Sequence, residues 1–234
     1  MADANSTDSG GHSTPPTAAI FDLDGTITRY GTYTPFVWGV ACREPAKLVH
    51  VVPVLAAAAA YKTGLITRTR LKERMLLATL GGVSRAEVRR HATDFTDRFM
   101  RGNVRPGALK SVERHKTEGD YLILATASFA FYAEIFAQRM GFDRVIATRT
   151  VLDTEGRMTG AIDGENCRGD AKLLRVIGTL AELGSQFRTV VYSDHHADLP
   201  LLRWADHAFA VNPTKALKQC ARAERFEILD WNVA

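Results

Sequence analysis

The 234-residue chain is poor in cysteine and contains no long uninterrupted hydrophobic run. Its three cysteines, Cys42, Cys167 and Cys220, are too scattered for a disulfide framework or for a site with metal-ligand spacing. The longest mainly apolar stretch, residues 48–61, is interrupted by a histidine and a proline and is too short to span a bilayer. We therefore expect no transmembrane helix and a reducing, cytoplasmic setting.

Residues 1–16 lack the basic start and the apolar centre of a secretory signal, and their small polar composition predicts a disordered tail. The net charge of +4 is unevenly distributed, because residues 28–105 contain 14 Lys or Arg and only 5 Asp or Glu. Such a basic segment favours a phosphorylated metabolite, an acidic membrane surface or a nucleic acid, although a solvated helical surface explains any single arginine equally well. Aromatic residues do not alternate with the basic ones, so we expect no nucleic-acid binding.

Apolar strand patterns alternate with helical patterns along the chain. This alternation predicts an α/β fold with a Rossmann-like parallel sheet covered on both faces, that is, a three-layer α/β/α core. In such a sheet the functional sites lie at the carboxyl ends of the strands. The expected strands are 18–22, 121–126, 189–192 and 208–211, the expected helices are 106–118, 129–140, 170–183 and 197–204, and a hairpin is expected within 151–162.

A segment between the first and second strands has a helical pattern throughout and predicts an inserted all-helical cap. The expected division is a catalytic core of residues 17–33 and 103–234 and a cap of residues 34–102. The expected cap elements are a helix over 45–64 that kinks at Pro53, a helix over 67–80 and a third helix that begins after residue 84.

The third cap helix has the clearest start signal, because Ser84 and Glu87 stand three residues apart as in a capping box. A stripe of apolar residues at this helical spacing is more often packing than ligand contact, so we interpret the stripe that follows as the core of the cap. Its members are Val88, Ala92, Phe95 and Phe99.

The most informative motif follows the first strand, where Asp22 and Asp24 stand two residues apart and Gly25 comes next. In an extended segment, residues i and i+2 point to the same side, so the two carboxylates can share one small site. Glycine permits a close approach of the backbone to an anion. Two like charges this near one another repel, so we expect a divalent cation or a proton shared with the substrate.

Further polar groups follow in chain order at strand ends or helix starts, namely Thr126, Lys172 and the pair Asp194 and Asp198. They supply a hydroxyl donor, a fixed cation and carboxylates for a metal, which are the requirements of phosphoryl transfer. Each of them alone also has a structural explanation, such as a strand threonine, an exposed lysine or a helix cap. The conjunction of all the motifs favours a single site.

With these motifs the chain resembles the haloacid dehalogenase-like hydrolases of subfamily IB, the branch that includes phosphoserine phosphatase. The resemblance covers residues 18–231. It implies a Mg²⁺-dependent phosphatase for a small phosphomonoester, in which Asp22 attacks phosphorus and forms an aspartyl-phosphate. Asp24 would act as general acid and base, and this second carboxylate distinguishes phosphatases from the dehalogenases and cation pumps of the family.

The resemblance also implies the roles of the remaining residues. Mg²⁺ would be bound by Asp22, by the backbone carbonyl of Asp24 and by Asp194. Asp198 would lie behind these ligands and orient water or the Lys172 ammonium. The phosphoryl oxygens would be bound by Gly25, Thr126 and Lys172.

The chain departs from this branch at several positions. His195 and His196 follow the fourth-motif aspartate, where glycine or serine is usual, and we expect them to face solvent or substrate rather than a metal. Phosphoserine phosphatases generally carry a lid glutamate after the first motif and a glycine pair after the second. This chain has Thr28-Arg29-Tyr30 and Ala127-Ser128 there, which argues against phosphoserine as the substrate.

The identity of the substrate and the oligomeric state stay open. Residues 48–61 precede a basic run, so the cap can also be interpreted as a membrane-resting surface of a lipid-phosphate phosphatase. We prefer burial of this helix in the cap or in a dimer contact, because a helix that is apolar all round is usually buried. A non-catalytic protein that binds a phosphorylated ligand is the remaining alternative. The basic run comprises Arg68, Arg70, Lys72 and Arg74.

Overall fold

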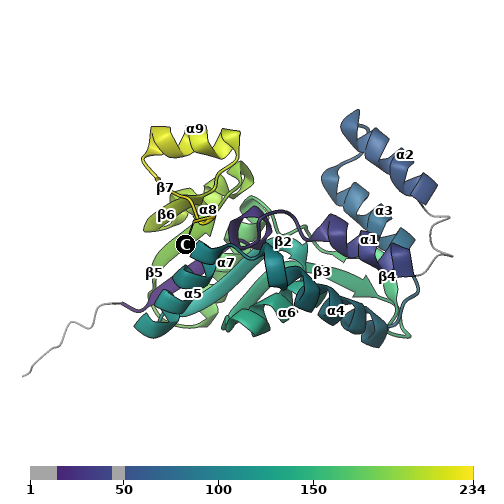
Figure 1. The fold of residues 1–234 in the computed structure, drawn as a ribbon, viewed down its shortest axis with the longest axis horizontal. Coiled ribbons are helices and arrows are strands. Elements are labelled where there is room, and N and C mark those ends of the chain that lie inside the picture. Colours follow the sequence, from purple (N-terminus) through teal and green to yellow (C-terminus); the bar gives the residue numbers. More distant parts are fainter. Residues whose placement is uncertain (1–14, 44–50, 234) are drawn as a thin grey trace, which may run out of the picture.

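A computed structural model describes residues 15–43 and 51–233, and a seven-stranded sheet lies at its centre (Figure 1). The strand order is β4-β3-β2-β1-β5-β6-β7. Only β3 and β4 pair in the antiparallel direction within this sheet. The predicted α/β class with a largely parallel sheet is therefore confirmed. The strands are β1 (Thr17–Phe21), β2 (Tyr121–Phe129), β3 (Arg144–Leu152), β4 (Met158–Asp163), β5 (Arg188–Ser193), β6 (His207–Val211) and β7 (Glu227–Leu229).

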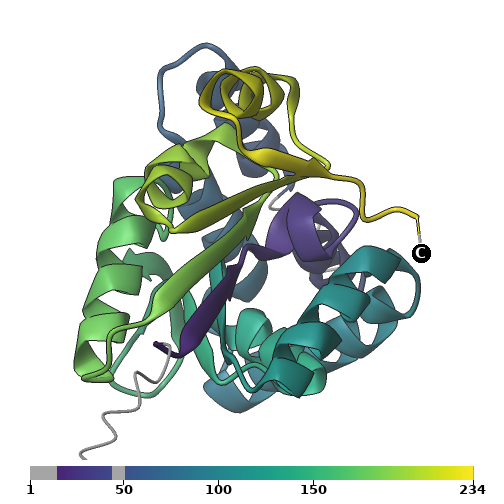
Figure 2. The same ribbon diagram turned by 90° about the vertical axis from the view of Figure 1, so that its left-hand side faces the viewer.

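Helices cover both faces of this sheet (Figure 2). In β1, Ala18 and Ile20 belong to one buried cluster and Ala19 and Phe21 to the other, because successive side chains of a strand point to opposite faces. The second cluster contains residues of α5 (Pro106–Glu118) and α6 (Ala130–Met140). The first contains residues of α7 (Asp170–Glu182), α8 (Leu199–Trp204) and α9 (Lys215–Glu224). This is the expected three-layer arrangement.

Four further helices lie between β1 and α5, in the segment expected to form the cap (Figure 1). They are α1 (Tyr33–Arg43), α2 (Val51–Lys62), α3 (Arg68–Leu80) and α4 (Arg85–Asn103). Ser84 caps α4 as predicted, since its side chain accepts a hydrogen bond of 3.3 Å from the backbone N–H of Glu87. The boundaries proposed for a separate cap domain stay a prediction.

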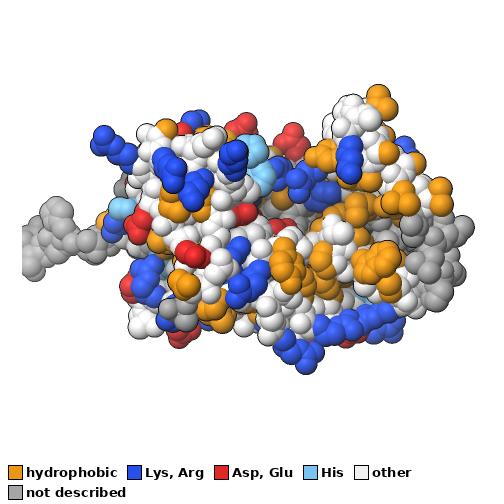
Figure 3. Space-filling view, turned by 45° about the horizontal axis from the view of Figure 1, so that its top comes forward, with side chains coloured by type: hydrophobic (Ala, Val, Ile, Leu, Met, Phe, Trp, Pro, Cys, Tyr) orange, Lys and Arg blue, Asp and Glu red, His pale blue; other side chains and the backbone are white. Residues whose placement is uncertain are grey.

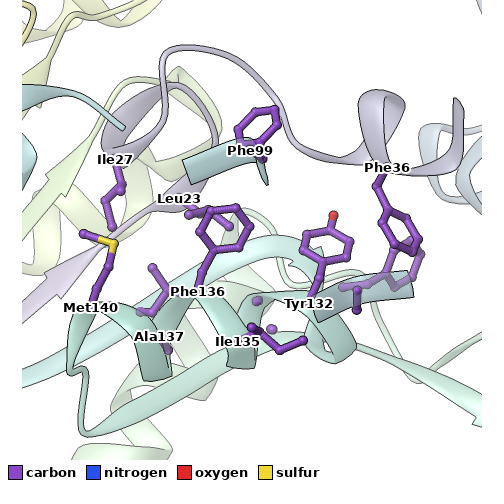
Figure 4. Close-up of a cluster of buried hydrophobic side chains, with 14 of the residues drawn as sticks. Leu23, Ile27, Phe36, Phe99, Tyr132, Ile135, Phe136, Ala137 and Met140 are labelled. Carbon is purple, nitrogen blue, oxygen red and sulfur yellow. The ribbon is translucent and has the colours of Figure 1, made fainter. Parts of the chain in front are cut away.

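The apolar stripe of α4 packs against the helix α6 as well as within the cap (Figure 4). Phe99 meets Phe136 of α6 with ring centroids 6.2 Å apart, and Phe95 meets Tyr132 of α6 at 6.0 Å. Tyr132 also contacts Phe36 of α1 at 5.2 Å. The stripe is therefore packing, as predicted, and the cluster it belongs to includes α6 as well as the cap helix α1.

The apolar helix α2 is mostly exposed, so the expectation that it is buried within the cap was wrong, whereas its burial in a dimer contact stays a prediction. Ala57 is buried, whereas Val52 and Leu55 keep 72% and 62% of their surface exposed among the described residues. The proposed start of this helix at Pro45 lies outside the described residues. Pro53 falls within α2.

Some elements were not expected from the sequence. The hairpin was found, but its first strand, β3, is longer than predicted and also pairs in parallel with β2. The short strand β7 and the helix α9 had not been anticipated. Most of the predicted tail, residues 1–14, lies outside the described residues. Within the described ranges, no helix combines the length and the apolar character needed to cross a bilayer.

Candidate active site

The sheet register brings three of the sequence motifs to one edge. Phe21 of β1 pairs with Leu124 of β2 on one side and with Tyr192 of β5 on the other. Asp22 directly follows Phe21, and Thr126 and Asp194 come two residues after those two partners. Because all three strands are parallel, the predicted site residues lie together at the carboxyl ends of adjacent strands.

Lys172 joins two carboxylates in the interior of this site. Its Nζ donates to Asp22 Oδ1 at 2.9 Å and to Asp198 Oδ2 at 2.7 Å, and Ser193 Oγ donates to the same Asp198 oxygen at 2.7 Å. All four side chains are buried. Burial alone lowers the pKa of the Lys172 ammonium, but the charges of Asp198 and Asp22 outweigh burial and raise that pKa. The ammonium therefore stays charged and holds Asp22 in place.

Negative charge exceeds positive charge around Asp22. Burial raises the pKa of its carboxyl group well above the ordinary value, and Lys172 opposes this shift. The neighbouring carboxylates of Asp198, Asp194 and Asp24 raise the same pKa further. The pocket thus combines several acidic oxygens with one buried ammonium, and a bound cation would relieve their repulsion.

Asp194 lies against the turn that follows β1. The Thr26 hydroxyl donates to Asp194 Oδ1 at 3.1 Å. Gly25 has a φ of +86°, and a Cβ at this position would lie 2.7 Å from Asp194 Cγ. Burial raises the pKa of Asp194 to about 6, and the hydrogen bond from Thr26 partly opposes the shift. Only glycine therefore combines the required backbone angle with the close approach of this carboxylate.

Hydroxyl groups from two directions hold the Asp24 carboxylate. Its Oδ1 accepts hydrogen bonds of 2.7 Å from both the backbone N–H and the hydroxyl of Thr32, which precedes α1. Its Oδ2 accepts one of 2.5 Å from Ser128 Oγ, to which the Tyr132 hydroxyl donates at 2.9 Å. Thr126 Oγ1 in turn accepts the backbone N–H of Ser128 at 3.0 Å. Ser128 of β2 and Thr32 before α1 thus fix the orientation of the Asp24 carboxylate.

Arg105 is a supporting residue that sequence reasoning missed. Its Nε and Nη2 donate to the Gly25 carbonyl at 3.1 and 3.0 Å, and its Nη1 donates to the Asn232 side chain. These bonds connect the turn after β1 with the C-terminal segment. No spacing signal marks Arg105 in the sequence, where it is one arginine of a basic segment that precedes a helix-starting proline.

The two adjacent histidines lie beside the site. His195 Nδ1 accepts the backbone N–H of Ala197 at 3.0 Å, and the His195 and His196 rings are 4.5 Å apart. Arg168 Nη2 lies 3.3 Å from His195 Nδ1. Burial, Arg168 and His196 lower the pKa of His195 to about 4, so its ring is neutral near pH 7.

A separate cluster of possible metal-ligating atoms has a structural explanation. Ligand atoms of His115, Glu118 and Asp120 lie within 4.8 Å of one another at the amino end of β2. His115 Nδ1 pairs with Asp120 Oδ2 at 2.6 Å, and His115 Nε2 lies 2.9 Å from the Tyr192 hydroxyl. Both ring nitrogens are engaged within the protein, so this cluster carries no functional assignment.

Comparison with known proteins agrees with the arrangement of the site. The model of the haloacid dehalogenase-like hydrolase family matches residues 19–203. Protein CicA of Caulobacter vibrioides is 29% identical over 195 residues, which cover 82% of this chain and 84% of CicA. Phosphoserine phosphatase SerB1 of Mycobacterium tuberculosis is 27% identical over 223 residues, which cover 93% of this chain and 71% of SerB1.

A solved structure supports the same relationship. The crystal structure of a protein of unknown function from Bordetella pertussis Tohama I superposes with a TM-score of 0.81 at 27% identity, covering 93% of this chain and all of that chain. The fold, the family match and these relatives agree with the resemblance drawn from the motifs. The chain belongs to the haloacid dehalogenase-like hydrolase family.

Proposed function

We propose that the protein is a Mg²⁺-dependent phosphomonoesterase that works through an aspartyl-phosphate on Asp22. The observation that carries the proposal is the buried contact of Asp22 with Lys172, beside a second carboxylate, Asp24, that hydroxyls hold in a fixed orientation. A nucleophile, a cation for the phosphoryl oxygens and an acid are thereby supplied at one sheet edge. A non-catalytic ligand-binding protein would have no need for the oriented Asp24.

The residues present fit a magnesium ion. The donors are oxygens only, and burial together with mutual repulsion raises the pKa of both Asp22 and Asp194, which a cation would reverse. Asp22, Asp194 and the backbone carbonyl of Asp24 would hold the ion. When bound, it would neutralise charge on the phosphoryl group and on the carboxylates.

In the first step, a carboxylate oxygen of Asp22 attacks phosphorus while the bond to the ester oxygen breaks. Asp24, in its protonated form, gives its proton to the departing alcohol oxygen. Lys172 and Thr126 stabilise the charge on the phosphoryl oxygens, and Gly25 allows its backbone to approach them. The alcohol leaves, and the phosphoryl group stays bound to Asp22.

In the second step, the Asp24 carboxylate takes a proton from water, and the resulting hydroxide attacks phosphorus. The bond between phosphorus and the Asp22 oxygen breaks, which releases inorganic phosphate and restores the Asp22 carboxylate. Asp24 is protonated again and ready for the next ester. The proton balance closes over the two steps without a further acid or base.

The direct test is the hydrolysis of p-nitrophenyl phosphate with Mg²⁺ by the wild-type protein and by Asp22→Asn. We expect Asp22→Asn to abolish turnover while circular dichroism and thermal unfolding show an intact fold. Asp94→Asn is the matched control, because Asp94 is an exposed carboxylate of α4. Absence of phosphate release by the wild-type protein from a broad panel of phosphate esters would contradict the proposal.

A second experiment tests the covalent route without measuring turnover. Beryllium fluoride with Mg²⁺ mimics a phosphoryl group on a carboxylate and should raise the unfolding temperature of the wild-type protein. Asp22→Asn should lose this stabilisation, whereas Asp94→Asn should keep it. Equal stabilisation of wild-type protein and Asp22→Asn would speak against Asp22 as the acceptor.

One observation favours a second candidate, a phosphatase for lipid phosphates at an anionic membrane surface. The cap exposes Val52, Leu55 and Leu65, and the exposed arginine Arg68 follows in sequence (Figure 3). Exposed apolar side chains next to cationic ones are typical of interfacial helices. The candidate predicts sedimentation with phosphatidylglycerol vesicles that Leu55→Glu weakens, and hydrolysis of micellar rather than soluble phosphate esters.

A further inference from the structure

The cap helix α3 places a buried lysine against the sheet edge that carries the site. Lys72 is 7% exposed, and its Nζ donates to the backbone carbonyl of Ala127 at 2.7 Å and to Asn166 Oδ1 at 2.8 Å. The ammonium also lies 4.4 Å from the centre of the Phe129 ring. Its two hydrogen-bond acceptors are neutral, and an ammonium has three donors, so one N–H of Lys72 has no acceptor in these bonds.

Two arginines lie close enough to affect this lysine electrostatically. The positive charges of Arg68, on the same helix, and of Arg168, in the loop before α7, both disfavour the protonated form of Lys72. Arg68 and Arg168 also repel each other. Arg168 is half-buried and Arg68 is exposed, so the three cations extend from the interior to the surface. Figure 3 shows basic and histidine side chains around the hollow between the cap and the sheet layer.

None of these three cations forms a close ion pair within the described part of the chain. Among the carboxylates of the described residues, none lies within 4.0 Å of the side-chain nitrogens of Lys72, Arg68 or Arg168. Asp24 attracts Lys72 from farther away, but hydroxyls of Thr32 and Ser128 occupy its oxygens. Asp198 and Asp22 attract Arg168 in the same way, but both already accept hydrogen bonds from the Lys172 ammonium. Cations that repel one another beside a pocket form an unfavourable arrangement unless an anion is bound there.

We propose that Lys72, Arg68 and Arg168 bind a second anionic group of the substrate, and that this subsite rejects a substrate that carries an ammonium beside that group. This inference rests on the proposed phosphatase function and specifies its substrate class. Beside these three cations an ammonium would be repelled, and the nearby carboxylates already have hydrogen-bond partners within the protein. The favoured substrate is therefore an acidic phosphomonoester such as a phosphorylated hydroxy acid, and a phosphorylated amino acid is disfavoured.

A matched set of small phosphate esters tests the inference. 3-Phosphoglycerate and O-phosphoserine differ by a hydroxyl in place of an ammonium, and glycerol 3-phosphate lacks the carboxylate. Their inhibition constants against p-nitrophenyl phosphate hydrolysis measure binding even where an ester is turned over slowly. We expect 3-phosphoglycerate to bind at least tenfold more tightly than either of the other two.

Variants of the cations identify the subsite. Lys72→Met and Arg168→Gln should each reduce the preference for 3-phosphoglycerate over glycerol 3-phosphate by fivefold or more. Arg168→Gln covers the case in which Lys72→Met fails to fold, because Arg168 is only half-buried. Arg70→Gln is the matched control on α3, since Arg70 is exposed and pairs with Glu73 at 3.1 Å, and it should keep the preference.

The outcomes separate this inference from the proposed function. Equal binding of the three esters, or tighter binding of O-phosphoserine, overturns the subsite while the phosphatase function stands. A preference that persists in both Lys72→Met and Arg168→Gln also overturns it. Failure to hydrolyse p-nitrophenyl phosphate or any other ester contradicts the phosphatase function itself.

Discussion

The carboxylate of Asp194 rests on the backbone of Gly25, so closely that a Cβ at Gly25 would lie 2.7 Å from Asp194 Cγ. This contact joins the turn after β1 to the end of β5, the two segments that contribute carboxylates to the proposed metal site. The Gly25 carbonyl is held from the other side by Arg105, at 3.0 and 3.1 Å. The position of Gly25 therefore affects both Asp22 and Asp194.

Gly25→Ala should lower kcat by about 100-fold, because it displaces Asp194 by a distance that catalysis does not tolerate. The positive φ of Gly25 adds a backbone strain of about 1 kcal/mol. Gly156→Ala is the control, since Gly156 also has a positive φ but a Cβ added there would meet no heavy atom within 4 Å. Urea unfolding should show a loss of stability for both variants, larger for Gly25→Ala because its Cβ also collides with Asp194, and only Gly25→Ala should lose activity.

Lys172→Met should lower the free energy of unfolding by about 3–5 kcal/mol, because it leaves Asp22 and Asp198 buried without their cation. Arg203→Met removes an ion pair of 2.7 Å with Glu224 on the protein surface and should lower the free energy of unfolding far less, because solvent screens this pair. Urea denaturation at pH 7 without Mg²⁺ measures both. Similar losses for the two variants would show that Lys172 does not stabilise the buried carboxylates.

Ser128→Ala should lower kcat about tenfold with little change in KM, because a hydrogen bond to a carboxylate contributes about 1.5–3 kcal/mol and Thr32 still holds the other oxygen of Asp24. Steady-state kinetics with p-nitrophenyl phosphate separate the two parameters. Ser111→Ala is the control, since Ser111 is a buried serine of α5. A change confined to KM would contradict a role for Ser128 in orienting Asp24.

The residues at strand ends could be predicted from the sequence because a parallel sheet gathers them. Asp22, Thr126 and Asp194 each follow an apolar run, and such runs are the strongest signal for buried strands. Once the strands are parallel and adjacent, convergence of their carboxyl ends follows from the topology alone. Lys172 could be added because it begins a helix directed at the same edge.

The supporting residues could not be predicted, because their positions depend on the paths of loops. Thr32, Arg105 and Asn166 are single polar residues without periodicity or motif spacing. Arg105 and Asn166 act through hydrogen bonds to residues far away in the sequence, namely Gly25 and Lys72, and Thr32 reaches Asp24 across an irregular loop. A sequence pattern reports local structure and burial, and it contains no information on which loop lies next to which strand end.

Most of β3 and the edge strand β7 were missed for a related reason. β3 carries Arg144 and Arg149, and β7 has only three residues, so neither has the continuous apolar run of a central strand. For α2 the prediction failed in the opposite direction, because a buried element was expected and an exposed one was found. Its apolar composition predicts burial, yet a sequence does not specify whether the covering partner belongs to the same chain.

The charge of Lys72 should depend on pH near neutrality. Burial lowers the pKa of its ammonium to about 7, and the causes that follow are Asp24, which raises it, and Arg68, which lowers it. The remaining charged or titratable neighbours are Cys167, which raises this pKa, Arg168, which lowers it, and Tyr33 of α1, whose ring centre lies 5.8 Å away. A lysine with a lowered pKa is charged below that pKa and neutral above it.

The preference for 3-phosphoglycerate over glycerol 3-phosphate should therefore decrease as the pH rises from 6 to 8.5. Both esters carry the same phosphate group, so its own ionisation cancels in the ratio of their inhibition constants. Lys72→Arg keeps a cation at every pH in this range and should make the ratio nearly constant at a high value, whereas Lys72→Met should make it constant at a low value. A ratio in the wild-type protein that stays unchanged across this range would show that Lys72 does not face the second anionic group.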